Sequence, residues 1–226
     1  MYDRSYDDQV LTFEASGGLI NSSLVLQDQE TDTYWAIMTG EAVHGEKYGT
    51  RLKELAINRK MKWKRWKNQH PDTSVLSLDG VEDIPDRYGP YFASPVGFRG
   101  AAASDPRLNT KDPIFAFRLG ARKYAVHHDD LVMGTVFRLG DQQVLLLREQ
   151  GAEMFQSTLA FATHNGDFRQ ETGTWLHTAS GCRLNLQSEE FQGVKTCPAR
   201  LPGFDTFWYN WSLNNPETEV LKNPDR

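Results

Sequence analysis

An internal repeat constrains the fold of this 226-residue chain more than any other feature of its sequence. Each copy contains two tryptophans three residues apart, followed by a proline, an acidic residue, a threonine and a Val-Leu pair. The copies begin at Trp63 and Trp208, and the offset of 145 residues (208 − 63) holds at each of these positions. Self-similarity at a fixed offset indicates a duplicated structural unit.

The match extends upstream with small changes in the offset. Residues 29–34 match residues 170–175 at an offset of 141 (170 − 29), and Leu11-x-Phe13 matches Leu159-x-Phe161 at an offset of 148 (159 − 11). Loop insertions and deletions produce this kind of drift. We therefore expect two related halves joined by a linker. Residues 1–80 hold the first repeat, residues 81–113 form a linker or wrap-around loop, and residues 114–226 hold the second repeat over 157–223.

Each half is predicted to be mainly β with one short helix. Runs rich in β-branched and aromatic residues, bounded by turn-forming residues, are typical of strands. After the linker, strands are predicted at residues 114–119, 123–126, 135–139 and 143–148. Helices are expected at residues 55–69 and 205–213, the second with Asp205 as its N-cap. We expect Trp63 and Trp208 to be buried between helix and sheet. The predicted fold class is therefore mainly β, a β-rich α+β fold.

Several motifs carry a family resemblance. They are Gly17-Gly18-Leu19, Asp28-x-Glu30-Thr31-x3-Trp35, Thr39-Gly40-Glu41-Ala42-Val43-x-Gly45, Gly49-Thr50-Arg51-Leu52, Trp63-x-x-Trp66-x3-His70-Pro71-Asp72-Thr73, Tyr88-Gly89-x-Tyr91-Phe92 and Asp105-x-Arg107-Leu108. In these motifs the chain resembles a widespread prokaryotic family, domain of unknown function three-one-seven-nine, which is itself a double repeat. The resemblance covers most of the chain and implies a fold but no activity. The chain lacks the Tyr-Cys-Pro-x-Cys-Gly segment that family members usually carry, so we expect no chemistry that depends on that cysteine pair.

The densest set of metal-ligand types is the run His127-His128-Asp129-Asp130. Imidazole nitrogen and carboxylate oxygen suit zinc, iron or manganese. Adjacent strand residues point to opposite faces, so only two of the four side chains could reach one metal ion. A further ligand, such as His164 or His177, would have to join them. The alternative is a polar loop between two strands.

Cys182 and Cys197 lie 15 residues apart (197 − 182). They form a disulfide if the chain folds in an oxidising compartment, and otherwise they are free thiols. The sequence contains no apolar run long enough for a membrane span and no basic-then-apolar start typical of a signal peptide. As written, the chain is expected to be cytoplasmic and to have no membrane partner, unless it is the processed form of an exported protein.

The segment 51–67 carries eight basic residues and one acidic residue, Glu54, with Trp63 and Trp66 interleaved. Basic and aromatic residues together can bind single-stranded nucleic acid. However, the net charge is −5, from 25 basic and 30 acidic residues, and the matching second helix contains no Lys or Arg. We therefore expect no nucleic-acid partner and interpret the segment as a solvated surface helix.

Two functions are compatible with these features. The first is a small-molecule-binding or scaffold protein with a cleft between its two β-rich halves, because pockets favour such junctions. The alternative is an enzyme with His and Asp groups in the same cleft, for which a divalent metal is one option as cofactor. The candidate ligand-binding residues are Tyr124, His127, His128, Trp35 and Trp175, and the candidate metal ligands are His127, His128, Asp129 and Asp130. Because no catalytic motif occurs, catalytic residues are not assigned.

Overall fold

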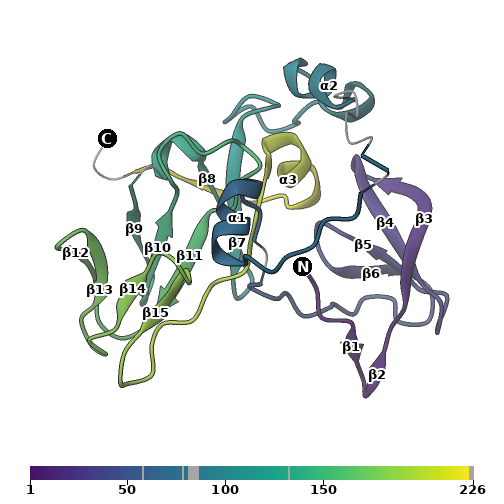
Figure 1. The fold of residues 1–226 in the computed structure, drawn as a ribbon. Helices are drawn as coiled ribbons and strands as arrows, with labels where there is room; N and C mark the ends of the chain where they lie inside the picture. Colours follow the sequence, from purple (N-terminus) through teal and green to yellow (C-terminus); the bar gives the residue numbers. More distant parts are fainter. Residues whose placement is uncertain (58, 78, 81–86, 132, 224–226) are drawn as a thin grey trace.

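A computed structural model describes residues 1–57, 59–77, 79–80, 87–131 and 133–223. Strands dominate the fold of these residues, which confirms the predicted mainly β class (Figure 1). The strands are β1 (Ser5–Tyr6), β2 (Gln9–Val10), β3 (Phe13–Ile20), β4 (Ser23–Asp28), β5 (Tyr34–Ala36), β6 (Glu41–His44), β7 (Pro113–Leu119), β8 (Arg122–His127), β9 (Thr135–Leu139), β10 (Gln142–Leu147), β11 (Leu159–Thr163), β12 (Phe168–Glu171), β13 (Thr174–His177), β14 (Arg183–Asn185), β15 (Glu190–Gln192), β16 (Gly203–Phe207) and β17 (Glu219–Leu221). The helices are α1 (Trp63–Gln69), α2 (Gly89–Ala93) and α3 (Trp208–Asn214), with short 3-10 turns η1 (Phe98–Gly100) and η2 (His128–Leu131).

The central sheet has the strand order β16-β7-β8-β17 and is covered on both faces. Ile114 and Ala116 of β7 pack against the tryptophans of α3, whereas Phe115 and Phe117 pack against the neighbouring sheet β11-β10-β9. This arrangement explains the sequence of β7, which is apolar at successive positions rather than alternating. Strands buried on both faces require such continuous hydrophobic runs.

The sheets β11-β10-β9 and β12-β13-β14-β15 pack on each other and form the left lobe of Figure 1. Leu145, Leu159 and Phe161 of the sheet β11-β10-β9 face away from the central sheet and pack against the sheet β12-β13-β14-β15. That outer sheet contributes Phe168, Trp175, Leu184 and Phe191 to the shared core. The second half is therefore built of stacked β layers.

Residues 1–55 form a separate lobe on the right of Figure 1, around the sheet β3-β4-β5-β6, whereas α1 lies at the centre. The small core of this lobe contains Leu11, Trp35, Ala42 and Leu52. The indole Nε1 of Trp35 donates a hydrogen bond to Asp28 Oδ2 at 2.7 Å, so this buried ring is satisfied within its own lobe.

The two repeat helices share their local geometry but not their packing. Each has seven residues. Trp66 Nε1 donates to Thr73 Oγ1 at 3.0 Å, and Trp211 Nε1 donates to Thr218 Oγ1 at 2.9 Å, so the same bond recurs at the offset of 145. The expected burial is confirmed for Trp208, which is 0% exposed, and is wrong for Trp63, which is 50% exposed. Duplication of the complete halves stays a prediction.

Both expected helices begin later than predicted. Glu54 and Leu55 belong to the first lobe, where Glu54 forms a bridge with Tyr2 and Leu55 N donates to Met1 O at 2.9 Å. Asp205 does not cap α3, because it lies in β16 and Phe207 takes the N-cap position. In each case pairing with a distant segment overrides the local helical preference.

The remaining expectations concern the linker and the cysteines. Within the expected linker, residues 81–86 lie outside the described residues, and the rest contains α2 and η1; the division into repeats and linker stays a prediction. Cys182 and Cys197 form a disulfide, which decides between the two alternatives for these residues. No helix among the described residues is long and apolar enough to cross a membrane.

Candidate functional site

A cavity of about 320 Å³ lies between the end of the first repeat and the strands of the second half. The first half contributes Arg59, Lys60, Met61 and Arg65 to its lining. The second half contributes Met133, Leu147, Arg148, Glu149, Ala152, Gln156, Ser157, Leu159, Gln170, Gly173, Trp175, Leu186 and Glu189. The cavity is thus a site to which both halves of the chain contribute.

The floor of the cavity is apolar and firmly placed. Leu147 of β10, Leu159 of β11 and Trp175 of β13 form it, and Trp175 is 9% exposed. The ring of Trp175 lies directly against the backbone of Gly134, where an added Cβ would be 2.6 Å from the ring. Gly134 has φ +102°, a conformation that favours glycine. The backbone at Gly134 therefore fixes the position of the Trp175 ring in the floor of the cavity.

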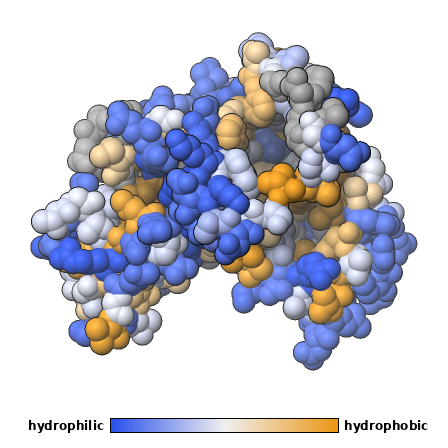
Figure 2. Space-filling model, in the orientation of Figure 1, coloured by the Kyte–Doolittle hydropathy of each residue, from blue (hydrophilic) through white to orange (hydrophobic). Residues whose placement is uncertain are grey.

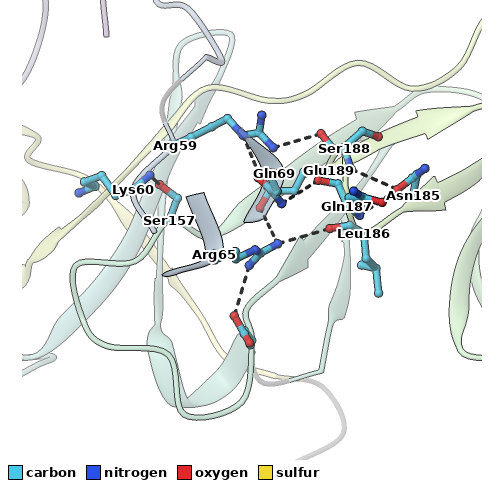
Figure 3. Close-up of polar contacts among 11 residues, drawn as sticks. Arg59, Lys60, Arg65, Gln69, Ser157, Asn185, Leu186, Gln187, Ser188 and Glu189 are labelled. Atoms are coloured by element: carbon cyan, nitrogen blue, oxygen red, sulfur yellow. Dashed lines mark hydrogen bonds and ion pairs between the residues drawn. The ribbon is translucent and has the colours of Figure 1, made fainter. Parts of the chain in front are cut away.

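The opposite wall is the segment that leads into α1. Lys60 N donates to Ser157 Oγ at 2.8 Å, and Ser157 N donates to Lys60 O at 2.8 Å. Arg59 Nε lies 3.0 Å from Glu189 Oε2, and Arg65 Nη2 lies 2.8 Å from Glu189 Oε1 (Figure 3). One buried carboxylate of the second half therefore binds two arginines of the first half, one at each oxygen.

Further polar contacts extend this wall along α1. Arg65 also pairs with Glu149 at 3.3 Å and donates to Leu186 O at 3.3 Å. Lys62 pairs with Glu153 at 3.4 Å. Figure 2 shows a hydrophilic band over the centre of the molecule, where α1 lies in Figure 1. The interpretation of this segment as a solvated helix is therefore incomplete, because several of its basic side chains are paired with acids of the second half.

Behind the cavity lies a buried ionic cluster. His128 Nε2 is 3.1 Å from Asp205 Oδ1, and Arg148 Nη1 is 3.3 Å from the same oxygen. Thr158 Oγ1 donates to Asp205 Oδ1 at 2.6 Å, and Thr158 N donates to Asp205 Oδ2 at 2.9 Å. Burial lowers the pKa of His128, although the hydrogen bond and charge of Asp205 oppose this shift. The pair is satisfied internally and does not belong to the lining of the cavity.

Arg148 connects the cluster to the cavity wall. Besides Asp205, its guanidinium donates to Gln156 O at 2.8 Å and to Glu153 O at 2.7 Å. These bonds hold the loop that supplies Ala152, Gln156 and Ser157 to the cavity. Since a buried charge must be compensated by partners, this network fixes the shape of the loop.

The structure separates most of the residues that the sequence proposed as a site. Trp175 lines the cavity, whereas Tyr124 and Trp35 are each 1% exposed and belong to two different cores. His128 turns to Asp205, while His127 Nδ1 accepts a hydrogen bond from Asp129 N at 3.2 Å.

The expected metal ligands also remain apart. His164 lies near Asp141, and His177 bonds to Ser180. In the described part of the chain, no three or more His, Cys, Asp or Glu residues form a group that could hold a metal ion. The run His127-His128-Asp129-Asp130 lies in this part and forms no such group. The structure gives the predicted metal site no support.

A family model described as "Protein of unknown function (DUF3179)" matches residues 1–218. No curated protein and no solved structure matches the chain.

Proposed function

Since this chain belongs to the DUF3179 family of proteins of unknown function, we propose a function from its geometry: it binds an apolar small molecule in the cavity between residues 59–65 and the second half. The observation that carries this proposal is the composition of the cavity. It combines an apolar floor with a charged wall in which Arg59 and Arg65 are paired with Glu189, and Arg65 also with Glu149.

Size and shape support a small ligand. Ligand pockets typically have volumes of about 300–1,000 Å³, so this cavity of about 320 Å³ lies at the lower end. The Trp175 ring offers a flat face, and aromatic groups stack favourably on such faces. Met61 and Met133 add flexible apolar surface that adapts to different shapes. A compact ligand with one or two rings fits these features.

The charges favour binding over catalysis. The two carboxylates in the lining, Glu149 and Glu189, are both paired with Arg65. A general base needs a carboxylate or imidazole within reach of the substrate and poised to take a proton. Here each of the two carboxylates is bound by an arginine side chain, so neither is left to act on a bound ligand.

The test is a fluorescence titration with anilinonaphthalene sulfonate, an aromatic dye that brightens in apolar sites. We expect saturable binding at one site per chain. Ala152 lines the cavity, so Ala152→Trp should fill it and weaken dye binding at least about tenfold, which corresponds to about 1.4 kcal/mol. Ala102 is exposed and does not line the cavity, so Ala102→Trp is the matched control. Equal dye affinity in the two variants would contradict the proposal.

The disulfide is informative about the cellular compartment of the protein. Disulfides persist in oxidising compartments and are rare in the reducing cytosol. The bond between Cys182 and Cys197 therefore favours export over the cytoplasm for this chain. Thiol labelling of protein recovered from its native cells without reductant tests this. Two labelled cysteines per chain would favour the cytoplasm instead.

A further inference from the structure

We propose that residues 59–73 form a lid over the cavity, that Glu189 holds the lid closed, and that opening of the lid admits the ligand. The claim that opening admits a ligand rests on the proposed function. The motion itself depends only on how these residues are attached to the rest of the protein.

The lid is held together by its own contacts. Trp66 Nε1 donates to Thr73 Oγ1 at 3.0 Å, and its ring lies 4.2 Å from the ring of His70. Lys67 Nζ donates to Thr73 O at 3.1 Å. These contacts link α1 to the turn that follows it. The segment can therefore move as one unit without losing its local structure.

The attachment of the lid to the second half is mainly polar. No residue of α1 is buried, in contrast to α3, which buries four residues including Trp208 and Trp211. Ion pairs and hydrogen bonds of Arg59, Lys60, Lys62, Arg65 and Gln69 hold the lid in place. Segments with few buried apolar contacts open at low free-energy cost.

Hollows also flank α1. One of about 420 Å³ is lined by Lys62, Lys64 and Asn68 together with residues 149–152. Another of about 460 Å³ is lined by Gln69 and His70 together with residues of the 185–190 turn. The helix therefore contacts the second half along a narrow strip.

The two ends of the lid are attached differently. On its N-terminal side, Leu55 N donates to Met1 O at 2.9 Å, and Glu54 pairs with Arg118, so the chain is fixed to the body of the protein. On its C-terminal side, Val75 is 62% exposed and Leu76 is 90% exposed. The lid, residues 59–73, lies between this fixed end and the exposed stretch, so it can move away from the second half.

Glu189 is the central contact of the closed state. Its side chain is 7% exposed and binds Arg59 and Arg65 at the same time. It lies on a rigid turn, because Asn185 Oδ1 accepts hydrogen bonds from Gln187 N at 2.8 Å and from Ser188 N at 3.1 Å. Removal of the Glu189 charge would leave two neighbouring arginines without their shared partner, and the lid would lose its strongest attachment.

Hydrogen exchange of the ligand-free protein tests the motion. In Glu189→Gln, the amides of Lys60 and Ser157, whose hydrogen bonds cross between the lid and the second half, should exchange about tenfold faster or more, since hydrogen bonds to charged groups contribute about that much. The amides of β7 and β10 should be unchanged. Glu190 is an exposed neighbour, so Glu190→Gln makes the same charge change and should behave as wild type. Unchanged exchange at Lys60 and Ser157, or equal acceleration in β7 and β10, would overturn the proposal.

Salt provides a second measurement that does not depend on a variant. Between about 0.1 M and 1 M salt, the screening length falls from about 10 Å to about 3 Å. The ion pairs Lys62–Glu153 and Arg65–Glu149 are exposed to solvent and are screened over this range. The amides of Lys60 and Ser157 in the wild type should therefore exchange faster at the higher concentration, and those of β7 should not. An unchanged pattern would show that these exposed ion pairs do not hold the segment closed.

Binding kinetics of anilinonaphthalene sulfonate separate the lid from the proposed function. If the lid controls entry, the association and dissociation rates of the dye both rise in Glu189→Gln and stay at wild-type values in Glu190→Gln. Equal rates in wild type and Glu189→Gln would refute the lid as a gate while the cavity remains a binding site. Faster exchange at Lys60 and Ser157 with no dye binding in any variant would refute the proposed function and leave the lid intact.

Discussion

Loss of the disulfide between Cys182 and Cys197 should cost about 3 kcal/mol of unfolding free energy. The bond closes a loop with a sequence separation of 15 residues. In the chain-entropy description, a loop of about 15 residues reduces the entropy of the unfolded chain by about 10 cal/mol/K, which is about 3 kcal/mol at 25 °C. Reduction of the wild type leaves both sulfur atoms in place, so it isolates the effect of the cross-link.

The assays are urea unfolding and thermal unfolding of the wild type with and without reductant, beside Cys182→Ala/Cys197→Ala. For a chain of this size, about 3 kcal/mol corresponds to a fall of about 6–12 °C in Tm. The double variant should lose about 3–4 kcal/mol, because Cys182 is fully buried and its sulfur also packs in the core between the two outer sheets. Its stability should not respond to reductant.

Two results would refute this reasoning. One is an identical unfolding midpoint for oxidised and reduced wild type. The other is a free-thiol count of two in protein that has been unfolded without reductant. The first would show that the cross-link does not limit the unfolded chain, and the second would show that the bond does not form.

Three further predictions concern single residues. Trp208→Ala should cost about 3–5 kcal/mol in urea unfolding, whereas Trp63→Ala should cost about 1 kcal/mol or less, because Trp208 is fully buried and Trp63 is half exposed; equal costs would contradict the packing described. Burial lowers the pKa of His128 below its ordinary value of 6.5, so on acidification through this window the unfolded chain takes up a proton before the folded chain does. Stability should therefore fall as the pH drops from about 7 to about 5, and His128→Gln should lose part of this dependence; an equal acid loss in the variant would exclude His128 as a source. Gly134→Ala should cost about 1–3 kcal/mol in thermal unfolding, because its Cβ would lie 2.6 Å from the Trp175 ring; an unchanged Tm would show that the ring moves aside freely.

Strand positions were predictable where the residues themselves require burial. The expected strand at 135–139 coincides with β9, and those at 114–119 and 143–148 differ from β7 and β10 by one residue at one or both ends. The apolar runs in these segments can be satisfied only in the interior. Helix starts were less predictable, because Leu55 and Lys60 belong to the predicted helix 55–69 but bond to Met1 and Ser157 in the folded chain.

The candidate site was harder to predict than the fold. Trp175 was identified as an aromatic residue in a cleft, but its surroundings depend on pairs that are distant in sequence. Arg59 and Glu189 are 130 positions apart, and His128 and Asp205 are 77 positions apart. No local spacing encodes such pairs. The run His127-His128-Asp129-Asp130 was predicted as a site because it is dense in metal-ligand types. The backbone instead directs His127 and His128 to different partners.

The composition of the central sheet has a consequence for biosynthesis. β7 and β8 are synthesised around the middle of the chain, but their edge partners β16 and β17 come from residues 203–221, and the helix that covers one face lies between those two. The lobe formed by β3–β6 can fold while translation continues, because its pairing is complete by residue 55. One face of β7 and β8 can be covered by β9–β11, but the face with Ile114, Ala116 and Ala125 must wait for α3, until nearly all of the chain has left the ribosome. The nascent protein therefore passes through an interval with this apolar face uncovered, and transiently exposed apolar surface of this kind favours aggregation.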